Sequence, residues 1–244
     1  MIDLARIDSQ ALETEPYRWS FIDNLFSRQA ARSLAETFPR DNFKTVKGYD
    51  SEKGYEYEAR SLVYMGAGAP SHAKTLSTAW IQLAQETISS DYRASMSRLT
   101  GLDLSSSPIE VNVFHYGRGA WLGPHVDLKD KIVTHIFYFN RQWNADDGGC
   151  LSILRSSDLA DRAAQIAPIV GNSAVLVRSD SSWHAVPPVQ ESCRRSRRSM
   201  AVTFYRPGSI STMWPPGHSS PLHQYQADKL GGDVWRRLRD RLLH

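Results

Sequence analysis

"VFHYGRGAWLGPHVDLKDKIVTHIFYFNRQWNADDGGCLSIL", residues 113–154, consists of short β-branched and aromatic runs separated by glycine, asparagine and aspartate. Such runs predict β-strands connected by turns. Within the stretch, His125 and Asp127 stand two residues apart, a spacing that places both side chains on one face of a strand. An imidazole nitrogen beside a carboxylate oxygen suits a first-row transition metal such as Fe(II). The pair alone is a weak signal, because a surface histidine followed by a turn aspartate is common.

The surrounding sequence repeats the strand pattern. Each run is short and is bounded by Gly, Asn, Asp, Ser or Pro, which predicts a sandwich or barrel of serial strands. The predicted strands lie at residues 109–117, 131–140, 150–156, 172–179 and 199–207.

Helices are expected mainly before this β-rich part. Residues 26–39 have helical spacing, with Ser27 as N-cap and Pro39 as stop. Residues 71–102 predict one or two helices that begin at Ser71 or Ser90 and end at Gly101. Further helices are predicted at 156–168 and from Asp233 to the end, and residues 48–65 are expected to be extended or a mobile loop.

These elements predict one α+β, mainly β domain over residues 1–244. We expect a largely helical support region at 1–107, a catalytic core at 108–206, and a loop with a C-terminal helix at 207–244. A chain of 244 residues with 41% hydrophobic residues can bury one substantial core.

The bulk composition also limits the partners. A net charge of +3 without a long basic run argues against nucleic acid. No apolar run approaches the length of a membrane span. The N-terminus lacks the apolar stretch of a secretory signal, and the two cysteines suggest no disulfide framework, so we expect a cytoplasmic protein.

A third metal ligand is available further along the chain. His184 follows one predicted strand and precedes another, and neighbouring strands of a small barrel can bring it opposite His125 and Asp127. Two histidines and one carboxylate on one face form the facial triad of non-heme Fe(II) oxygenases.

The order of motifs resembles the prolyl-4-hydroxylase-like branch of the 2-oxoglutarate/Fe(II) dioxygenases. The family's "Y-x-x-G…H-x-D" strand is followed by a "YLN…W…GG-x-L" hairpin and a distal "H-x-V-x-P-V…R-x-S-L" block. The resemblance covers residues 108–206 and rests on "WHAVPPV" and "RRSM" together with Tyr116, Gly119, His125, Asp127, Tyr138, Phe139, Asn140, Trp143, Gly148, Gly149 and Leu151.

The resemblance implies a double-stranded β-helix (jelly-roll) fold that uses Fe(II), 2-oxoglutarate and O2, with ascorbate as a supporting reductant. It implies that His125, Asp127 and His184 are the catalytic metal ligands. Aligning "RRSM" with "R-x-S-L" selects Arg197 for the distal carboxylate of 2-oxoglutarate, with Ser199 on the same strand face. Arg195 is the alternative, because the distance from His184 to Arg197 is slightly long for the family.

Other residues near the motif have open or structural interpretations. Tyr116 is either a core aromatic or a phenol close to the co-substrate. His135 is expected to be structural, and His115 should face away from Tyr116. Gly148 and Gly149 are expected to serve a turn.

The resemblance therefore implies an oxygenase that hydroxylates an unactivated C–H bond and releases succinate and CO2. The small chain favours a free small molecule, such as an amino acid or a specialised-metabolite intermediate, and the surplus arginines are compatible with an anionic one. The presence of Asp127 favours hydroxylation over halogenation, while desaturation and ring closure remain open. The alternatives are a peptidyl (prolyl-type) hydroxylase and a non-catalytic, cupin-like metal-binding or sensor protein. The Pro- and aromatic-rich loop at 207–225 is either a substrate lid or a tether for the C-terminal helix.

Overall fold

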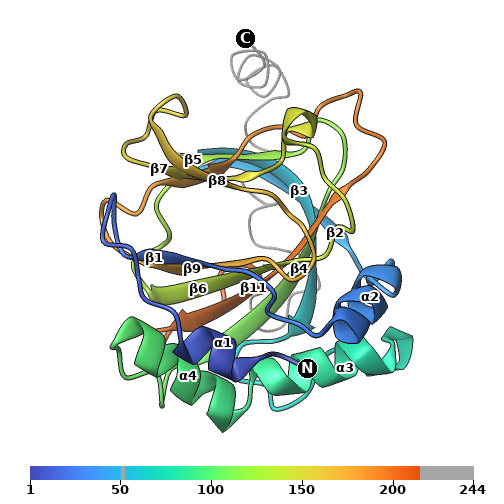
Figure 1. Ribbon diagram of the computed structural model, residues 1–244, viewed down its shortest axis with the longest axis vertical. Helices are drawn as coiled ribbons and strands as arrows, with labels where there is room; N and C mark the ends of the chain where they lie inside the picture. Colours follow the sequence, from blue (N-terminus) through green and yellow to red (C-terminus); the bar gives the residue numbers. More distant parts are fainter. Residues whose placement is uncertain (51–52, 215–244) are drawn as a thin grey trace.

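A computed structural model describes residues 1–50 and 53–214 (Figure 1). Its main feature is one antiparallel sheet that curls into a nearly closed barrel. In chain order the strands are β1 (Trp19–Ile22), β2 (Lys44–Asp50), β3 (Lys53–Val63), β4 (Ile109–Tyr116), β5 (Trp121–His125), β6 (Lys131–Tyr138), β7 (Leu151–Leu154), β8 (Arg162–Ile166), β9 (Ser173–Val177), β10 (His184–Val186) and β11 (Arg197–Tyr205).

The strand order gives the barrel two walls. One wall is β1-β9-β6-β11-β4-β3 and the other is β5-β10-β7-β8, while β2 pairs with β3 alone. The long strand β3 joins the walls because it pairs with both β4 and β5. Figure 1 shows the walls facing one another, with helices below the first one. The predicted mainly β, jelly-roll-like core with an N-terminal helical layer is confirmed.

Short helices cover the outer face of the first wall. They are α1 (Leu4–Asp8), α2 (Arg28–Glu36), α3 (Thr78–Thr87) and α4 (Ser90–Thr100). Two 3-10 turns also occur: η1 (Ala73–Thr75) precedes α3, and η2 (Ala145–Asp147) precedes β7 of the second wall.

The expected helix ends are partly confirmed. Ser27 caps α2 as predicted, and Gly101 ends α4 with a φ of 65°. The other predicted caps are wrong, since Ser77 caps α3 and Ser89 caps α4. Both capping residues have the extended backbone that an N-cap requires, whereas Ser90 is already helical.

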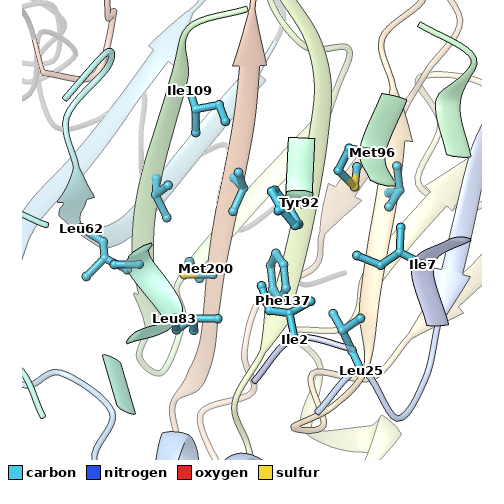
Figure 2. Close-up of a cluster of buried hydrophobic side chains, with 14 of the residues drawn as sticks. Ile2, Ile7, Leu25, Leu62, Leu83, Tyr92, Met96, Ile109, Phe137 and Met200 are labelled. Carbon is cyan, nitrogen blue, oxygen red and sulfur yellow. The ribbon is translucent and has the colours of Figure 1, made fainter. Parts of the chain in front are cut away.

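The main hydrophobic core lies between the helices and the barrel wall. Figure 2 shows Leu83, Tyr92 and Met96 from α3 and α4 against Phe137 of β6 and Met200 of β11. All five side chains are fully buried. This packing fixes which face of β6 and β11 is turned towards the barrel interior.

The helix predicted at 156–168 is wrong. Residues Arg162–Ile166 form the edge strand β8, which pairs with β7. Pairing with an available strand edge overrides the moderate helix propensity of an alanine-containing stretch. At residues 48–65 the extended alternative is correct, because this stretch forms most of the β2–β3 hairpin.

The predicted division of the chain into regions and the predicted C-terminal elements remain predictions. The division at residues 107 and 206 is one such expectation, although β1, β2 and β3 add strands from the support region to the sheet. The helix predicted from Asp233 and most of the 207–225 loop lie outside the described residues.

Candidate metal and co-substrate site

The barrel interior contains a cavity of about 120 Å³. Strand alternation determines its lining: Arg197 and Ser199 of β11 face the cavity, while Met200 packs against the helices. Lys131, Thr134 and Ile136 of β6 contribute, as do Glu110, Asn112, Phe114 and Tyr116 of β4.

His125, Asp127 and His184 lie together at this cavity. His125 ends β5 and His184 begins β10, and the two are directly paired across the strands. One ligand atom from each residue lies within 4.8 Å of the others, and all three residues are buried. The strands thus bring together two residues that are 59 positions apart in the sequence.

Backbone contacts orient both imidazoles. Nδ1 of His125 lies 2.9 Å from the Gly123 carbonyl oxygen, and Nδ1 of His184 lies 2.9 Å from the Ser182 carbonyl oxygen. A carbonyl can only accept, so each Nδ1 carries a proton, and in the neutral ring the lone pair is then on Nε2. This is the tautomer that a metal-binding histidine requires.

Two donors hold the Asp127 carboxylate. Lys131 Nζ donates to Oδ1 at 2.7 Å, and Thr134 Oγ1 donates to Oδ2 at 2.9 Å. Burial opposes ionisation, but the charge and hydrogen bond of the Lys131 ammonium, with the charge of the two imidazoles whenever they are protonated, outweigh it and hold the pKa of Asp127 well below its usual range. Asp127 is therefore a carboxylate at neutral pH.

Arg197 is a buried cation in the cavity wall. Its Nη1 donates to Ser199 Oγ at 2.7 Å, and its guanidinium lies 4.8 Å from the Tyr116 ring centroid and 5.4 Å from that of Tyr138. Among the described residues, its Nε has no hydrogen-bond partner. Arg195, the alternative from the sequence, is exposed and lies 3.6 Å from Asp147 outside the cavity.

Tyr116 also lines the cavity, and its ring stacks on Tyr57 at 5.1 Å. Burial raises the pKa of Tyr116 to about 12, although the Arg197 charge opposes the rise. The phenol therefore keeps its proton and can donate a hydrogen bond. Tyr57 comes from β3, a stretch in which no sequence motif predicts a site residue.

The residues expected to be structural lie outside the cavity lining. His115 contacts Glu58 at 2.7 Å, and His135 Nδ1 lies 2.9 Å from the Tyr92 hydroxyl under α4. Burial lowers the pKa of His135 to about 3, so its ring is neutral. Gly148 has a φ of 69°, and a Cβ there would lie 2.1 Å from the Pro188 carbonyl oxygen, as its expected turn role requires.

Several cavity residues were missed at the sequence level. Lys131 and Thr134 follow the H-x-D motif and could have been found from strand alternation once the register of β6 was known. Glu110 and Asn112 give no local signal, because they form their network with a segment about 100 residues away.

That network fixes one end of the cavity. The Glu110 carboxylate accepts hydrogen bonds from Ser211, Tyr205 and Asn112, and the Trp214 indole donates to Asn112 Oδ1 at 2.6 Å. Burial raises the pKa of Glu110, and these donors partly offset the rise. Ser211 and Trp214 thus tie residues 211–214, the tethered segment, to β4. Between them, Thr212 and Met213 line the cavity.

The donor set and the cation fit the implied cofactors. Two neutral imidazoles and one ionised carboxylate form a set that binds Fe(II). A buried guanidinium with an unpartnered Nε suits the distal carboxylate of 2-oxoglutarate, because Arg can form two parallel hydrogen bonds to it.

Residues 111–206 match the profile of the 2OG-Fe(II) oxygenase superfamily. They include His125, Asp127, His184 and Arg197, but not Glu110 or the contributions of β3 and the segment after β11. The sequence of this core is therefore similar to that of the 2OG-Fe(II) oxygenases. The protein is accordingly an oxygenase whose cofactors are Fe(II), 2-oxoglutarate and O2.

Solved structures of the superfamily share the fold. A Pseudomonas putida prolyl-4-hydroxylase is 22% identical, with a TM-score of 0.53, over 83% of this chain and 98% of its own. A Trichoplax adhaerens prolyl hydroxylase, in complex with a hypoxia inducible factor peptide fragment, is 14% identical, with a TM-score of 0.57, over 84% and 87%. A Burkholderia pseudomallei 2OG-Fe(II) oxygenase family protein is 14% identical, with a TM-score of 0.54, over 90% and 93%.

Two searches gave negative results. No match was found among curated protein sequences. In residues 1–50 and 53–214, no helix combines the length and the apolar character that crossing a bilayer requires.

Proposed function

We propose that this oxygenase hydroxylates an unactivated C–H bond of a small molecule, with succinate and CO2 as co-products. His125, Asp127 and His184 hold the metal, and Arg197, assisted by Ser199 and Tyr116, holds 2-oxoglutarate. The proposal rests on the convergence of three buried ligand atoms within 4.8 Å in a cavity that Arg197 also lines.

With Fe(II) and 2-oxoglutarate bound, O2 would serve as the oxidant, one oxygen atom entering the new hydroxyl group and the other entering succinate as CO2 is lost. The chain's own residues orient the reactants. The Gly123 and Ser182 carbonyls fix the two imidazoles, Lys131 and Thr134 fix Asp127, and the barrel wall limits access of water.

The tethered segment favours a small substrate over a peptide. Thr212 and Met213 form part of the cavity wall, and hydrogen bonds from Ser211 and Trp214 to β4 hold them there. A wall fixed by buried bonds narrows the space for a polypeptide.

The other arginines near β11 offer no support for an anionic substrate. Arg194, Arg195 and Arg198 do not line the cavity, where Lys131 and Arg197 are the basic residues among those described. Lys131 is already paired with Asp127.

A peptidyl hydroxylase is the second candidate. It is favoured by the fold likeness to the prolyl hydroxylases of Pseudomonas putida and Trichoplax adhaerens.

Succinate formation tests both candidates. The purified protein is incubated aerobically with Fe(II), ascorbate and 2-oxoglutarate, either with pooled small metabolites or with pooled proline-containing peptides. We expect substrate-dependent succinate with the metabolites, whereas stimulation by peptides alone would favour the second candidate. No stimulation by either, with the metal still bound, would favour the cupin-like alternative, whereas no stimulation and no metal binding would count against the oxygenase.

Variants test the ligand set. His184→Ala should abolish metal binding, while His72→Asn is a matched control, because His72 is exposed and its φ of 49° is tolerated by asparagine. Full metal binding and turnover in His184→Ala would show that His184 is not a metal ligand.

A further inference from the structure

A second basic site lies outside the barrel. A hollow of about 630 Å³ is lined by Arg141, Arg194, Arg195 and Arg198, together with Ala35, Phe139, Asn140, Gln142 and Ser196. We call it the arginine groove. No carboxylate is among its lining residues, and it shares none of them with the catalytic cavity.

Strand alternation separates the two sites. Arg197 and Arg198 are adjacent on β11, and Arg197 faces the cavity while Arg198 lines the groove. An anion in the groove therefore lies on the opposite side of the strand from the proposed 2-oxoglutarate site.

Asn140 holds the groove in shape. Its Nδ2 donates to the Ser196 carbonyl at 2.7 Å, and its Oδ1 accepts from the Arg198 backbone N–H at 2.8 Å. The Phe139 backbone N–H also donates to the Arg198 carbonyl at 3.1 Å. These bonds join the end of β6 to the start of β11, so the backbone of Ser196 and Arg198 is held in place beside the other arginines.

The nearby carboxylates leave much of this charge unneutralised. Arg141 lies 3.7 Å from Glu36 and Arg195 lies 3.6 Å from Asp147, both longer than a hydrogen bond. Glu36 already pairs with Arg32 at 2.9 Å. Among the described residues, no ion pair with Arg194 occurs.

Arg198 is the most constrained of the four. Its guanidinium lies 5.2 Å from the Phe38 ring centroid, in a half-buried position. Burial and the neighbouring charge of Arg40 lower the pKa of Arg198. Like charges gathered at a partly buried position are unfavourable for the protein alone and become favourable when an anion binds.

The chemistry of the groove favours phosphate. A guanidinium matches the oxygens of phosphate with paired hydrogen bonds, and several of them together suit an anion with more than one charged group. The volume lies within the roughly 300–1,000 Å³ of small-molecule sites. The mild net charge of +3 argues against a long nucleic acid.

We propose that the arginine groove is a binding site for a small anion carrying at least two phosphate groups. This site is independent of the catalytic cavity and of the function proposed for it.

Calorimetric titration with inorganic pyrophosphate tests the site. The full-length protein is titrated at about 0.15 M salt, where charges farther apart than about 8 Å are screened. Excess 2-oxoglutarate occupies the cavity, and divalent metals are omitted because pyrophosphate chelates them. We expect one saturable site, weakened at least about 10-fold, or about 1.4 kcal/mol, by the double change Arg194→Gln/Arg195→Gln.

Two controls separate the groove from general electrostatics and from the cavity. The change Arg155→Gln/Arg162→Gln removes the same charge from the β7–β8 edge and should leave affinity within about 3-fold, since distant charges are screened. Arg197→Gln should also leave it unchanged, because Arg197 lines the cavity.

The remaining outcomes overturn the proposal. These are no pyrophosphate binding at millimolar concentration, equal weakening in both double variants, or loss of binding in Arg197→Gln. If a single-stranded oligonucleotide binds the groove with much higher affinity than pyrophosphate and with steep salt dependence, the ligand is a nucleic acid and not a small anion.

Discussion

Asp127, a proposed metal ligand, shows how neighbouring residues hold a carboxylate in place. Thr134 donates to Asp127 Oδ2 at 2.9 Å, and Thr134→Val removes this donor while keeping the side-chain shape. We expect about 10- to 100-fold weaker metal binding, the usual effect of losing a contact that orients a ligand. Titration with Co(II) measures it. Thr203→Val is the control, since Thr203 lines the same cavity and has no such bond to Asp127. Equal losses in both variants would show a general packing effect.

Arg197 and Arg195 provide a second matched pair. Arg197→Gln should weaken 2-oxoglutarate binding about 10- to 100-fold, because a hydrogen bond to a charged group contributes about 1.5–3 kcal/mol. Arg195→Gln should change it little, since Arg195 lies outside the cavity. Anaerobic calorimetry measures both. The opposite ranking would transfer the co-substrate role to Arg195.

At the scale of single residues, the sequence identified the residues able to bind a metal but not the neighbouring residues that hold them in position. His125, Asp127 and His184 are readable because few residue types bind transition metals and the H-x-D spacing is local. Lys131, Thr134 and Tyr57 are not readable in the same way, because common residues acquire their contacts only through strand register.

Among the structural elements, the segment after β11 is held by a buried network. Trp214 donates to Asn112 Oδ1 at 2.6 Å. Trp214→Phe leaves this buried acceptor without its donor, so we expect a loss of about 1–3 kcal/mol in the free energy of unfolding. Trp19→Phe is the control, since the Trp19 indole bonds to the Glu15 carbonyl at an exposed position. Denaturant unfolding compares them, and equal losses would argue against a special role for the Trp214 tether.

His135 gives the interface between α4 and β6 a pH dependence. Its pKa is about 3 when folded, below the usual value of 6.5. The unfolded chain therefore binds a proton more readily, so stability falls as the pH decreases from about 6.5 towards 3. The loss is at most about 1.4 kcal/mol per pH unit.

His135→Gln should reduce this slope, because glutamine does not titrate and can still form a hydrogen bond with the Tyr92 hydroxyl. Denaturant unfolding between pH 7 and 4 measures it. An unchanged slope would exclude His135 as a source of acid sensitivity.

The elements themselves were predicted unevenly. Strands β4, β6, β7, β9 and β11 carry clear alternation or β-branched runs, and α2 has a capping serine and a stop. β8 was mistaken for a helix because its alanines favour a helix, while only the edge of β7 provides its hydrogen-bond partner.

For the whole molecule, metal binding should stabilise the fold. A ligand at about 100 times its Kd adds about 2.7 kcal/mol if it binds only the folded state. For a chain of this size, this corresponds to a rise in Tm of roughly 5–10 °C. Anaerobic thermal unfolding with Co(II) measures it. His125→Ala should remove the rise and His72→Asn should keep it, whereas a similar rise in His125→Ala would place the stabilising metal elsewhere.

The sequence by itself determined the mainly β class, the order of the motifs and the residue types able to bind a metal, because these depend on local spacing. Only the tertiary structure decided that His184 pairs with His125, that Arg197 faces the cavity while Arg198 faces the groove, and that Glu110 and Asn112 anchor the segment at Ser211–Trp214. These contacts join strands that are distant in the chain. Their register is set by the shared core beneath the helices, and no local pattern records it.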